Sequence, residues 1–217
     1  MAQRTAAPRP KPRLYLVTPP IEDATAFAAP LSVALGAGDI AAVLLRLKDG
    51  DERGQINSAK TLVRVAQDKD VALVVETRAQ LVARAGADGA HLTGIEAFTE
   101  SLPGLRPDRI AGCGGLASRH DAMLAAEAGA DYVMFGEPDE GGVRPAFAAI
   151  EERVGWWTEV FEIPCVGYAA TLDEVAALVF AGADFVALGD FVWREPQHAA
   201  AQVSAAAQRL ALPETTA

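Results

Sequence analysis

The chain has 217 residues, of which 51% are hydrophobic, and its 19 basic against 29 acidic residues give a formal net charge of −10. This acidic balance, without a basic stripe, argues against a nucleic-acid surface and against binding to anionic membranes, although small anions could still bind locally. No segment has the apolar length of a membrane span or a signal peptide. Cys113 and Cys165 each fall inside a predicted strand, which indicates reduced core thiols in a cytoplasmic protein rather than a disulfide or a zinc site.

Short apolar runs alternate along the chain with stretches of helical spacing. Residues 1–12 are rich in alanine, proline and basic side chains, and we expect a flexible N-terminal tail there, before one domain over residues 13–212. The runs at residues 13–18, 71–75, 109–113 and 163–167 read as buried strands. The helices expected between strands include residues 23–35, with Asp23 as N-cap, and residues 55–67.

Four further strands belong to a repeated unit of helix, glycine turn and strand. Its copies are Gly86-Ala87-Asp88, Gly129-Ala130-Asp131 and Gly182-Ala183-Asp184, with a looser one at residues 36–43. Glycine suits the left-handed residue that ends a helix, and the apolar run after each aspartate reads as a strand. The aspartates are 43 to 53 residues apart, which leaves room for two strand–helix units of about 30 residues or fewer. Eight strands alternating with helices predict an α/β fold, a single-domain (β/α)8 TIM barrel, with an open doubly wound sheet as the alternative.

The second strand, which runs into a loop at residues 43–49, carries the first candidate site. Alternation places Leu44, Arg46 and Lys48 on one face. If that face is the barrel interior, two cations point at the carboxyl end of the barrel, where enzymes of this fold bind substrates. A planar guanidinium and a point charge together suit phosphate or diphosphate, so both are candidate catalytic residues. The alternative is an ordinary strand end whose cations pair with carboxylates such as Asp49 or Glu76.

Two carboxylates follow the next strands of the predicted barrel. Glu76 comes directly after residues 71–75, and Glu96 follows the strand at residues 88–92. Barrel enzymes place metal ligands and acids at such positions. The alternatives are that Thr77 caps the next helix and that Glu96 lies in a first helical turn, where the dipole favours a carboxylate. His91, a lone histidine inside a strand, is interpreted as a structural residue.

The later loops carry the candidates for phosphate binding. Gly114 lets a ligand or backbone approach closely, and Arg144 is the only cation of an acidic loop at residues 136–145 that has the length of a lid. In this fold the loops after the seventh and eighth strands commonly bind phosphate through backbone N–H groups. This rule makes candidates of three small residues there: Ala169, Ala170 and Gly189.

With these segments in this order, the sequence resembles the thiamine phosphate synthase family, which includes thiazole tautomerases. The resemblance rests on Leu45-Arg46-Leu47-Lys48 and on the three glycine-alanine-aspartate segments, and it extends over nearly the whole predicted barrel. It implies a transferase of thiamine biosynthesis that joins hydroxymethylpyrimidine diphosphate to thiazole phosphate and releases pyrophosphate. It also implies that cations and Mg²⁺ hold the leaving diphosphate, with Arg46 and Lys48 as the cations and Glu76 and Glu96 in the positions of the magnesium ligands.

Several polar residues of the family's site are replaced in this chain. The family's glutamine, its serine and its hydroxyl-bearing loop residues give way to apolar residues or glycine, at Leu44, Gly114 and 141–143. The family's Gly-Gly-Ile phosphate turn becomes Ala169-Ala170-Thr171, and the tautomerase histidine falls near Leu116. Two alternatives therefore stay open beside the synthase. One is an enzyme for another phosphorylated or heterocyclic ligand, and the other is a non-catalytic paralogue that binds a ligand. A homodimer is a possible assembly.

Overall fold

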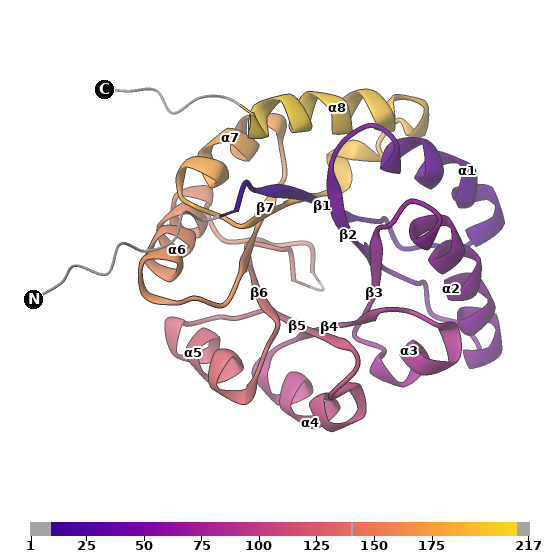
Figure 1. Cartoon of the computed structure of the whole chain (residues 1–217), viewed down its shortest axis with the longest axis horizontal. Helices are drawn as coiled ribbons and strands as arrows, with labels where there is room; N and C mark the ends of the chain where they lie inside the picture. Colours follow the sequence, from indigo (N-terminus) through magenta and orange to yellow (C-terminus); the bar gives the residue numbers. More distant parts are fainter. Residues whose placement is uncertain (1–9, 140, 212–217) are drawn as a thin grey trace, which may run out of the picture.

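The computed structural model describes residues 10–139 and 141–211 of the chain, and in them eight parallel strands close into a barrel in the order of the sequence (Figure 1). The strands are β1 Arg13–Val17, β2 Ile40–Leu45, β3 Ala72–Glu76, β4 Gly89–Thr93, β5 Ile110–Gly114, β6 Tyr132–Phe135, β7 Cys165–Ala169 and β8 Phe185–Leu188. The helices are α1 Ala24–Leu35, α2 Glu52–Gln67, α3 Ala79–Ala85, α4 Ile95–Leu105, α5 Arg119–Ala128, α6 Phe147–Val160, α7 Leu172–Phe180 and α8 Ala199–Leu210, with short 3-10 turns η1 Asp190–Val192 and η2 Pro196–His198 before α8. The predicted TIM barrel is confirmed, and most of the predicted tail lies outside the described residues.

The repeated unit explains how alternate strands are held at the start of the barrel. In its three close copies the glycine is left-handed, with φ of 73°, 103° and 94° at Gly86, Gly129 and Gly182, as expected for a helix end. The aspartate two residues later accepts a backbone N–H from the first or second residue of the preceding strand: Asp88 from Leu73 at 2.7 Å, Asp131 from Ala111 at 2.7 Å and Asp184 from Cys165 at 2.9 Å. Each copy therefore ends a helix and ties two neighbouring strands together.

Of the two helix caps that the sequence suggests, the structure contains one. Asp23 caps α1 as expected, and Ser118 with Asp121 forms a capping box on α5. Thr77 does not cap α3: it has a positive φ of 60°, and the helix begins after Arg78 without a side-chain cap. Asp190 is the first residue of η1, and Gly189 occupies its N-cap position.

The core has two layers, as alternation along the strands requires. A large cluster fills the space between the barrel and its helices, and it includes Trp157 of α6 and both cysteines, which are free thiols. A smaller cluster fills the barrel itself, and all three tyrosines of the chain belong to it; its buried members are Tyr15, Val17, Leu44, Val74, Tyr132, Met134, Val166, Tyr168 and Ala187.

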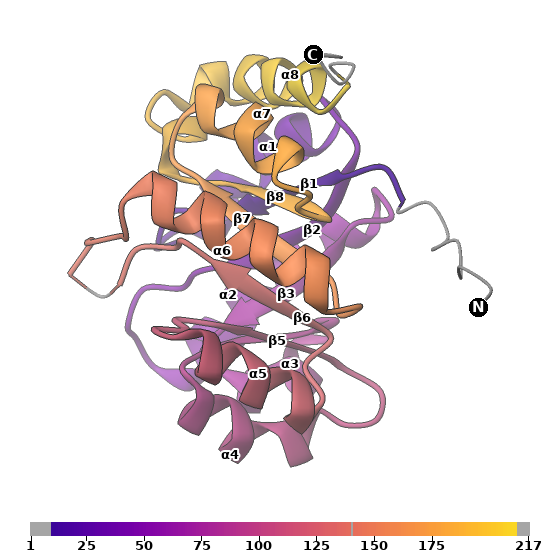
Figure 2. The same ribbon diagram turned by 90° about the vertical axis from the view of Figure 1, so that its left-hand side faces the viewer.

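The barrel has one end at which its strands stop and their loops gather. Figure 2 shows the β6–α6 loop standing out at this end, on the side opposite the start of β1, and in the axial view of Figure 1 its ribbon overlies the barrel centre. Over the described residues, no helix combines the length and apolar character that crossing a membrane requires.

Candidate functional site

Arg46 lies at the carboxyl end of the barrel, directly after β2. Its backbone N–H donates to Thr18 Oγ1 at 3.0 Å, and its guanidinium reaches carboxylates on both sides, with Nε 3.3 Å from Glu76 Oε1 and Nη1 3.5 Å from Asp190 Oδ1. The side chain is only 22% exposed. Within the described residues, Arg46 Nε is the one fully buried side-chain nitrogen or oxygen atom without a hydrogen bond. Arg46 thus presents a nearly buried cation, incompletely satisfied, at the mouth of the barrel.

Lys48 does not join Arg46. Strand β2 ends at Leu45, and Leu47 forms a β-bridge with Ile21 of the β1–α1 loop, so Lys48 follows that loop instead of the barrel interior. Its Nζ lies 2.6 Å from Glu22 Oε2 on the surface, and this hydrogen bond and the nearby charge lower the pKa of Glu22. Of the pairings that the sequence left open, the structure contains Arg46 with Glu76.

The two candidate metal ligands lie on neighbouring strand ends. Glu76 is in register with His91 of β4, and Glu96 is exposed in the first turn of α4, which follows β4. Within the described ranges, no cluster of three or more histidine, cysteine or acidic side chains could hold a metal ion. A magnesium ion, however, commonly takes one or two carboxylates together with substrate phosphates, and both residues offer the hard oxygen donors that it prefers.

A chain of hydrogen bonds runs through the buried interior to His91. Tyr15 Oη lies 2.8 Å from Tyr132 Oη, which in turn lies 3.0 Å from His91 Nδ1. Burial raises the pKa of both tyrosines above the ordinary value, so both keep their protons. The contacts allow an order in which Tyr15 donates to Tyr132, Tyr132 donates to Nδ1, and the imidazole carries a proton on Nε2. His91 is 2% exposed, as a structural residue would be, yet this order turns an Nε2–H toward the barrel mouth.

Glu137, which the sequence analysis overlooked, stands in front of His91 at the start of the β6–α6 loop. Its Oε1 accepts the backbone N–H of Gly115 and lies 3.9 Å from His91 Nε2. Gly114 makes this approach possible, because a Cβ at that position would overlap Glu137 Oε1 and crowd the His91 ring. Nearby, burial raises the pKa of the Cys113 thiol to about 12, so that this cysteine stays protonated and unreactive.

The residues predicted to bind phosphate after β6, β7 and β8 form hydrogen bonds within the protein or are buried. Arg144 binds Glu174 of α7, and Ala170 donates its backbone N–H to the same carboxylate at 2.7 Å. Ala169 is buried in β7, and the Gly189 N–H donates to Ala169 O at 3.0 Å as the strands continue their pairing. The carboxylates of Glu137 and Glu174 carry no signal in the sequence, because they reach their partners only when segments distant in sequence meet.

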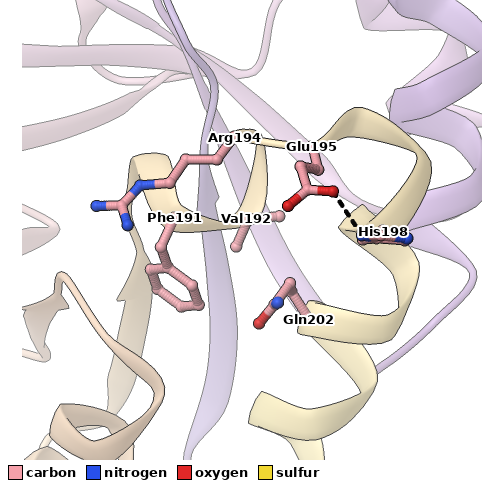
Figure 3. A pocket seen from close by; sticks show the side chains of 6 residues that line it. All are labelled: Phe191, Val192, Arg194, Glu195, His198 and Gln202. Carbon is pink, nitrogen blue, oxygen red and sulfur yellow. Dashed lines mark ion pairs between the residues drawn. The ribbon is translucent and has the colours of Figure 1, made fainter.

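Two cavities lie outside this site. One, of about 240 Å³, lies beside η1, η2 and the start of α8, where Glu195 and His198 form an ion pair of 3.1 Å (Figure 3). The other, of about 430 Å³, lies between α6 and α7 on the outer surface. Neither cavity is lined by a candidate site residue. The first is lined by Phe191, Val192, Arg194, Glu195, His198 and Gln202.

Comparison with known proteins adds evidence from sequence. A family model described as thiamine monophosphate synthase matches residues 14–192. The chain is 42% identical over 195 residues to a thiamine-phosphate synthase of Rhodospirillum centenum, covering 88% of this chain and 94% of that protein. It is 39% identical over 214 residues to one of Hyphomonas neptunium, covering 93% and 95%.

Among solved structures, the thiamine phosphate pyrophosphorylase of Pyrococcus furiosus superposes with a TM-score of 0.73. The alignment covers 92% of this chain and 96% of that one, at 19% identity, and therefore supports the barrel fold alone. The family model and the two relatives cover nearly all of the barrel. The chain belongs to the thiamine monophosphate synthase family.

Proposed function

We propose that this chain is a thiamine phosphate synthase, a transferase of thiamine biosynthesis. It would join hydroxymethylpyrimidine diphosphate to thiazole phosphate and release pyrophosphate. The observation that carries the proposal is the 42% identity to a thiamine-phosphate synthase over 88% of this chain. The position of Arg46 at the barrel mouth supports it, because this reaction needs a cation where the diphosphate leaves.

The proposed chemistry makes electrostatics the main task of the protein. The bond between the pyrimidine methylene carbon and the diphosphate oxygen breaks, its electron pair leaves with pyrophosphate, and the ring nitrogen of the thiazole supplies the pair for the new carbon–nitrogen bond. Negative charge therefore grows on the diphosphate in the transition state. Arg46 is held by Glu76 and Asp190 before substrate arrives, so little reorganisation is needed when this charge develops.

Lys48 and magnesium complete the proposed diphosphate site. Lys48 is 55% exposed, and solvent screens an exposed ion pair such as that with Glu22, so Lys48 can leave it for a substrate at small cost. Glu76 and Glu96 would hold Mg²⁺ together with diphosphate oxygens. When bound, the ion would offset part of the charge of the leaving group.

The proposal also specifies surroundings and assembly. Its partners are small phosphorylated molecules. Cys113 and Cys165 are both free thiols, in agreement with a cytoplasmic location where thiols stay reduced. A homodimer is included as the commonest closed assembly of soluble proteins, and sedimentation of the purified chain checks it.

Pyrophosphate release tests the activity. The purified chain, given both substrates and Mg²⁺, should release pyrophosphate and form a product with the mass of thiamine phosphate. Arg46→Ala should lower kcat/KM by about 100-fold or more, because it removes a preorganised charge from the transition state. Lys48→Ala should lower it less, since that side chain must first leave Glu22.

The matched control is Arg64→Ala on the exposed face of α2, which should behave as the unmodified chain. Absence of product at high enzyme concentration would overturn the synthase assignment. It would favour a ligand-binding role instead. Normal turnover by Arg46→Ala would leave the activity standing but remove Arg46 from it.

A further inference from the structure

Arg144 is engaged by the protein on every side of its guanidinium. Nε donates to Gly136 O at 3.2 Å, Nη2 donates to Tyr168 O at 3.0 Å, and Nη1 lies 2.8 and 3.1 Å from the two carboxylate oxygens of Glu174. Its Cζ also lies 5.6 Å from the centre of the Tyr168 ring. Gly136 begins the β6–α6 loop and Arg144 lies near its end, so this side chain closes the neck of the loop and joins it to β7.

Glu174 is engaged just as fully from the other direction. Besides Arg144, its Oε2 accepts the Ala170 backbone N–H at 2.7 Å, while its own N–H donates to Thr171 Oγ1, the N-cap of α7. The side chains of Arg144 and Glu174 are 18% and 16% exposed. A charge pair this far removed from water depends on all of these partners, because removal of one charge leaves the other uncompensated.

Two roles for Arg144 can be distinguished on these contacts. As a phosphate ligand it would need free N–H groups, and the neighbouring Ala170 N–H would need to be free as well. Arg144 Nη1 and the Ala170 backbone N–H donate to Glu174 instead, and this carboxylate would repel an incoming phosphate. The contacts fit a structural joint between the β6–α6 loop and α7 far better than a site that waits for an anion.

We propose that Arg144 and Glu174 form a clamp that positions the β6–α6 loop for the reaction, so that Arg144 acts as a positioning residue and not as a phosphate ligand. The clamp fixes Gly136, and Glu137 follows immediately and stands 3.9 Å from His91 at the barrel mouth. It also holds Tyr168, whose ring fills the space that Gly189 leaves open directly after β8. This inference rests on the proposed function only where turnover is its measure.

The direction of the effect of Glu174→Gln separates the two roles. If the pair is a clamp, Arg144→Gln and Glu174→Gln should each lower kcat by about 10-fold or more, because small misplacements in a site are costly, and the double variant should be no worse than either. If Arg144 binds phosphate, Glu174→Gln frees it, so KM for thiazole phosphate should fall in that variant and rise in Arg144→Gln. A KM for thiazole phosphate that falls in Glu174→Gln and rises in Arg144→Gln would overturn the clamp.

A second measurement needs no activity. In the chain without ligands, backbone amide hydrogen exchange at Gly141, Gly142 and Val143 should be about 10-fold faster in both variants, because the loop loses its joint to α7. Arg119→Gln is the matched control, since it removes an exposed arginine–glutamate pair between α5 and α6, and it should leave these amides unchanged. Unaltered exchange in the two clamp variants would rule out the clamp, whether or not the chain is a synthase.

Discussion

At the scale of single residues, the interior of the barrel holds polar groups that depend on one another. Tyr132 is the middle member of the buried hydrogen-bonded series, because its hydroxyl contacts both Tyr15 and His91. Tyr132→Phe should leave both neighbours without this partner in a buried place. We expect the free energy of unfolding to fall by about 1–3 kcal/mol, measured by urea denaturation.

Tyr15→Phe provides the comparison for this prediction. This substitution removes the terminal hydroxyl of the hydrogen-bonded series and leaves the contact of Tyr132 with His91 in place. The free energy of unfolding should therefore fall by only about 1 kcal/mol. Equal effects of the two substitutions would show that the order Tyr15 to Tyr132 to His91 does not govern the stability of these groups.

The residues of the site differ in how far the sequence could predict them. The position of Arg46 could be predicted from the sequence, because Arg46 directly follows a strand whose alternation is regular. Lys48 was not, since β2 ends at Leu45 and a β-bridge from another loop turns the chain away. The roles of Glu137 and Glu174 depend on contacts with residues 22 and 30 positions away in sequence, and no local pattern encodes such contacts.

At the scale of elements, the fold could be predicted because its determinants are local and repeated. A left-handed glycine, an aspartate that accepts a backbone N–H from the start of the preceding strand, and an apolar run recur three times. The looser first copy shows the limit of this reasoning, since Gly36 is right-handed with φ of −81° and Asp39 pairs with Arg13 instead. Four copies set about 50 residues apart were still enough to indicate eight strands.

Strand β5 contributes small residues where its neighbours contribute large ones. A Cβ on Gly112 would overlap the Tyr132 ring of β6, so this glycine makes the space in which the buried tyrosine lies. Gly112→Ala should therefore lower the free energy of unfolding by about 1–3 kcal/mol through overpacking. Thermal or urea unfolding measures this change.

Gly104→Ala in α4 is the control for Gly112→Ala. A Cβ added at Gly104 would have no neighbour within 4 Å apart from its own helix backbone. Alanine is favoured over glycine in a helix, so this variant should be unchanged or slightly more stable. If Gly112→Ala is tolerated as well as Gly104→Ala, the barrel interior has more freedom to repack than its contacts indicate.

At the scale of the whole molecule, the three candidate cations at the carboxyl end of the barrel are all paired with carboxylates. Arg46 faces Glu76 and Asp190, Lys48 faces Glu22, and Arg144 faces Glu174. The three cations are not held equally: Lys48 is exposed and released easily, Arg46 is partly satisfied by two pairs, and Arg144 is bonded through each of its nitrogens. This gradient argues that substrate anions engage the β2 side of the mouth, while the β6 and β7 side keeps its shape.

The same arrangement predicts how the molecule responds to alkali. All three tyrosines lie inside the barrel, and burial raises the pKa of each. Unfolded tyrosines ionise near pH 10, while the folded ones keep their protons to higher pH. Above about pH 10 the unfolded state therefore binds fewer protons, and stability falls as pH rises, by up to about 4 kcal/mol per pH unit when all three contribute. Below that pH their contribution is complete and constant.

Alkaline titration with paired readouts checks this response. Tyrosinate absorbance should stay low until the far-ultraviolet circular dichroism reports unfolding, and the two transitions should coincide. Tyr15→Phe should reduce the pH dependence of stability by about one third, because one of three equivalent protons is removed. Cys113 contributes in the same direction from lower pH, since burial raises the pKa of its thiol to about 12, so Cys113→Ser isolates the tyrosine part. Tyrosinate that appears near pH 10 while the fold is intact would mean that solvent reaches the barrel interior, and the buried chain to His91 would then be wrong.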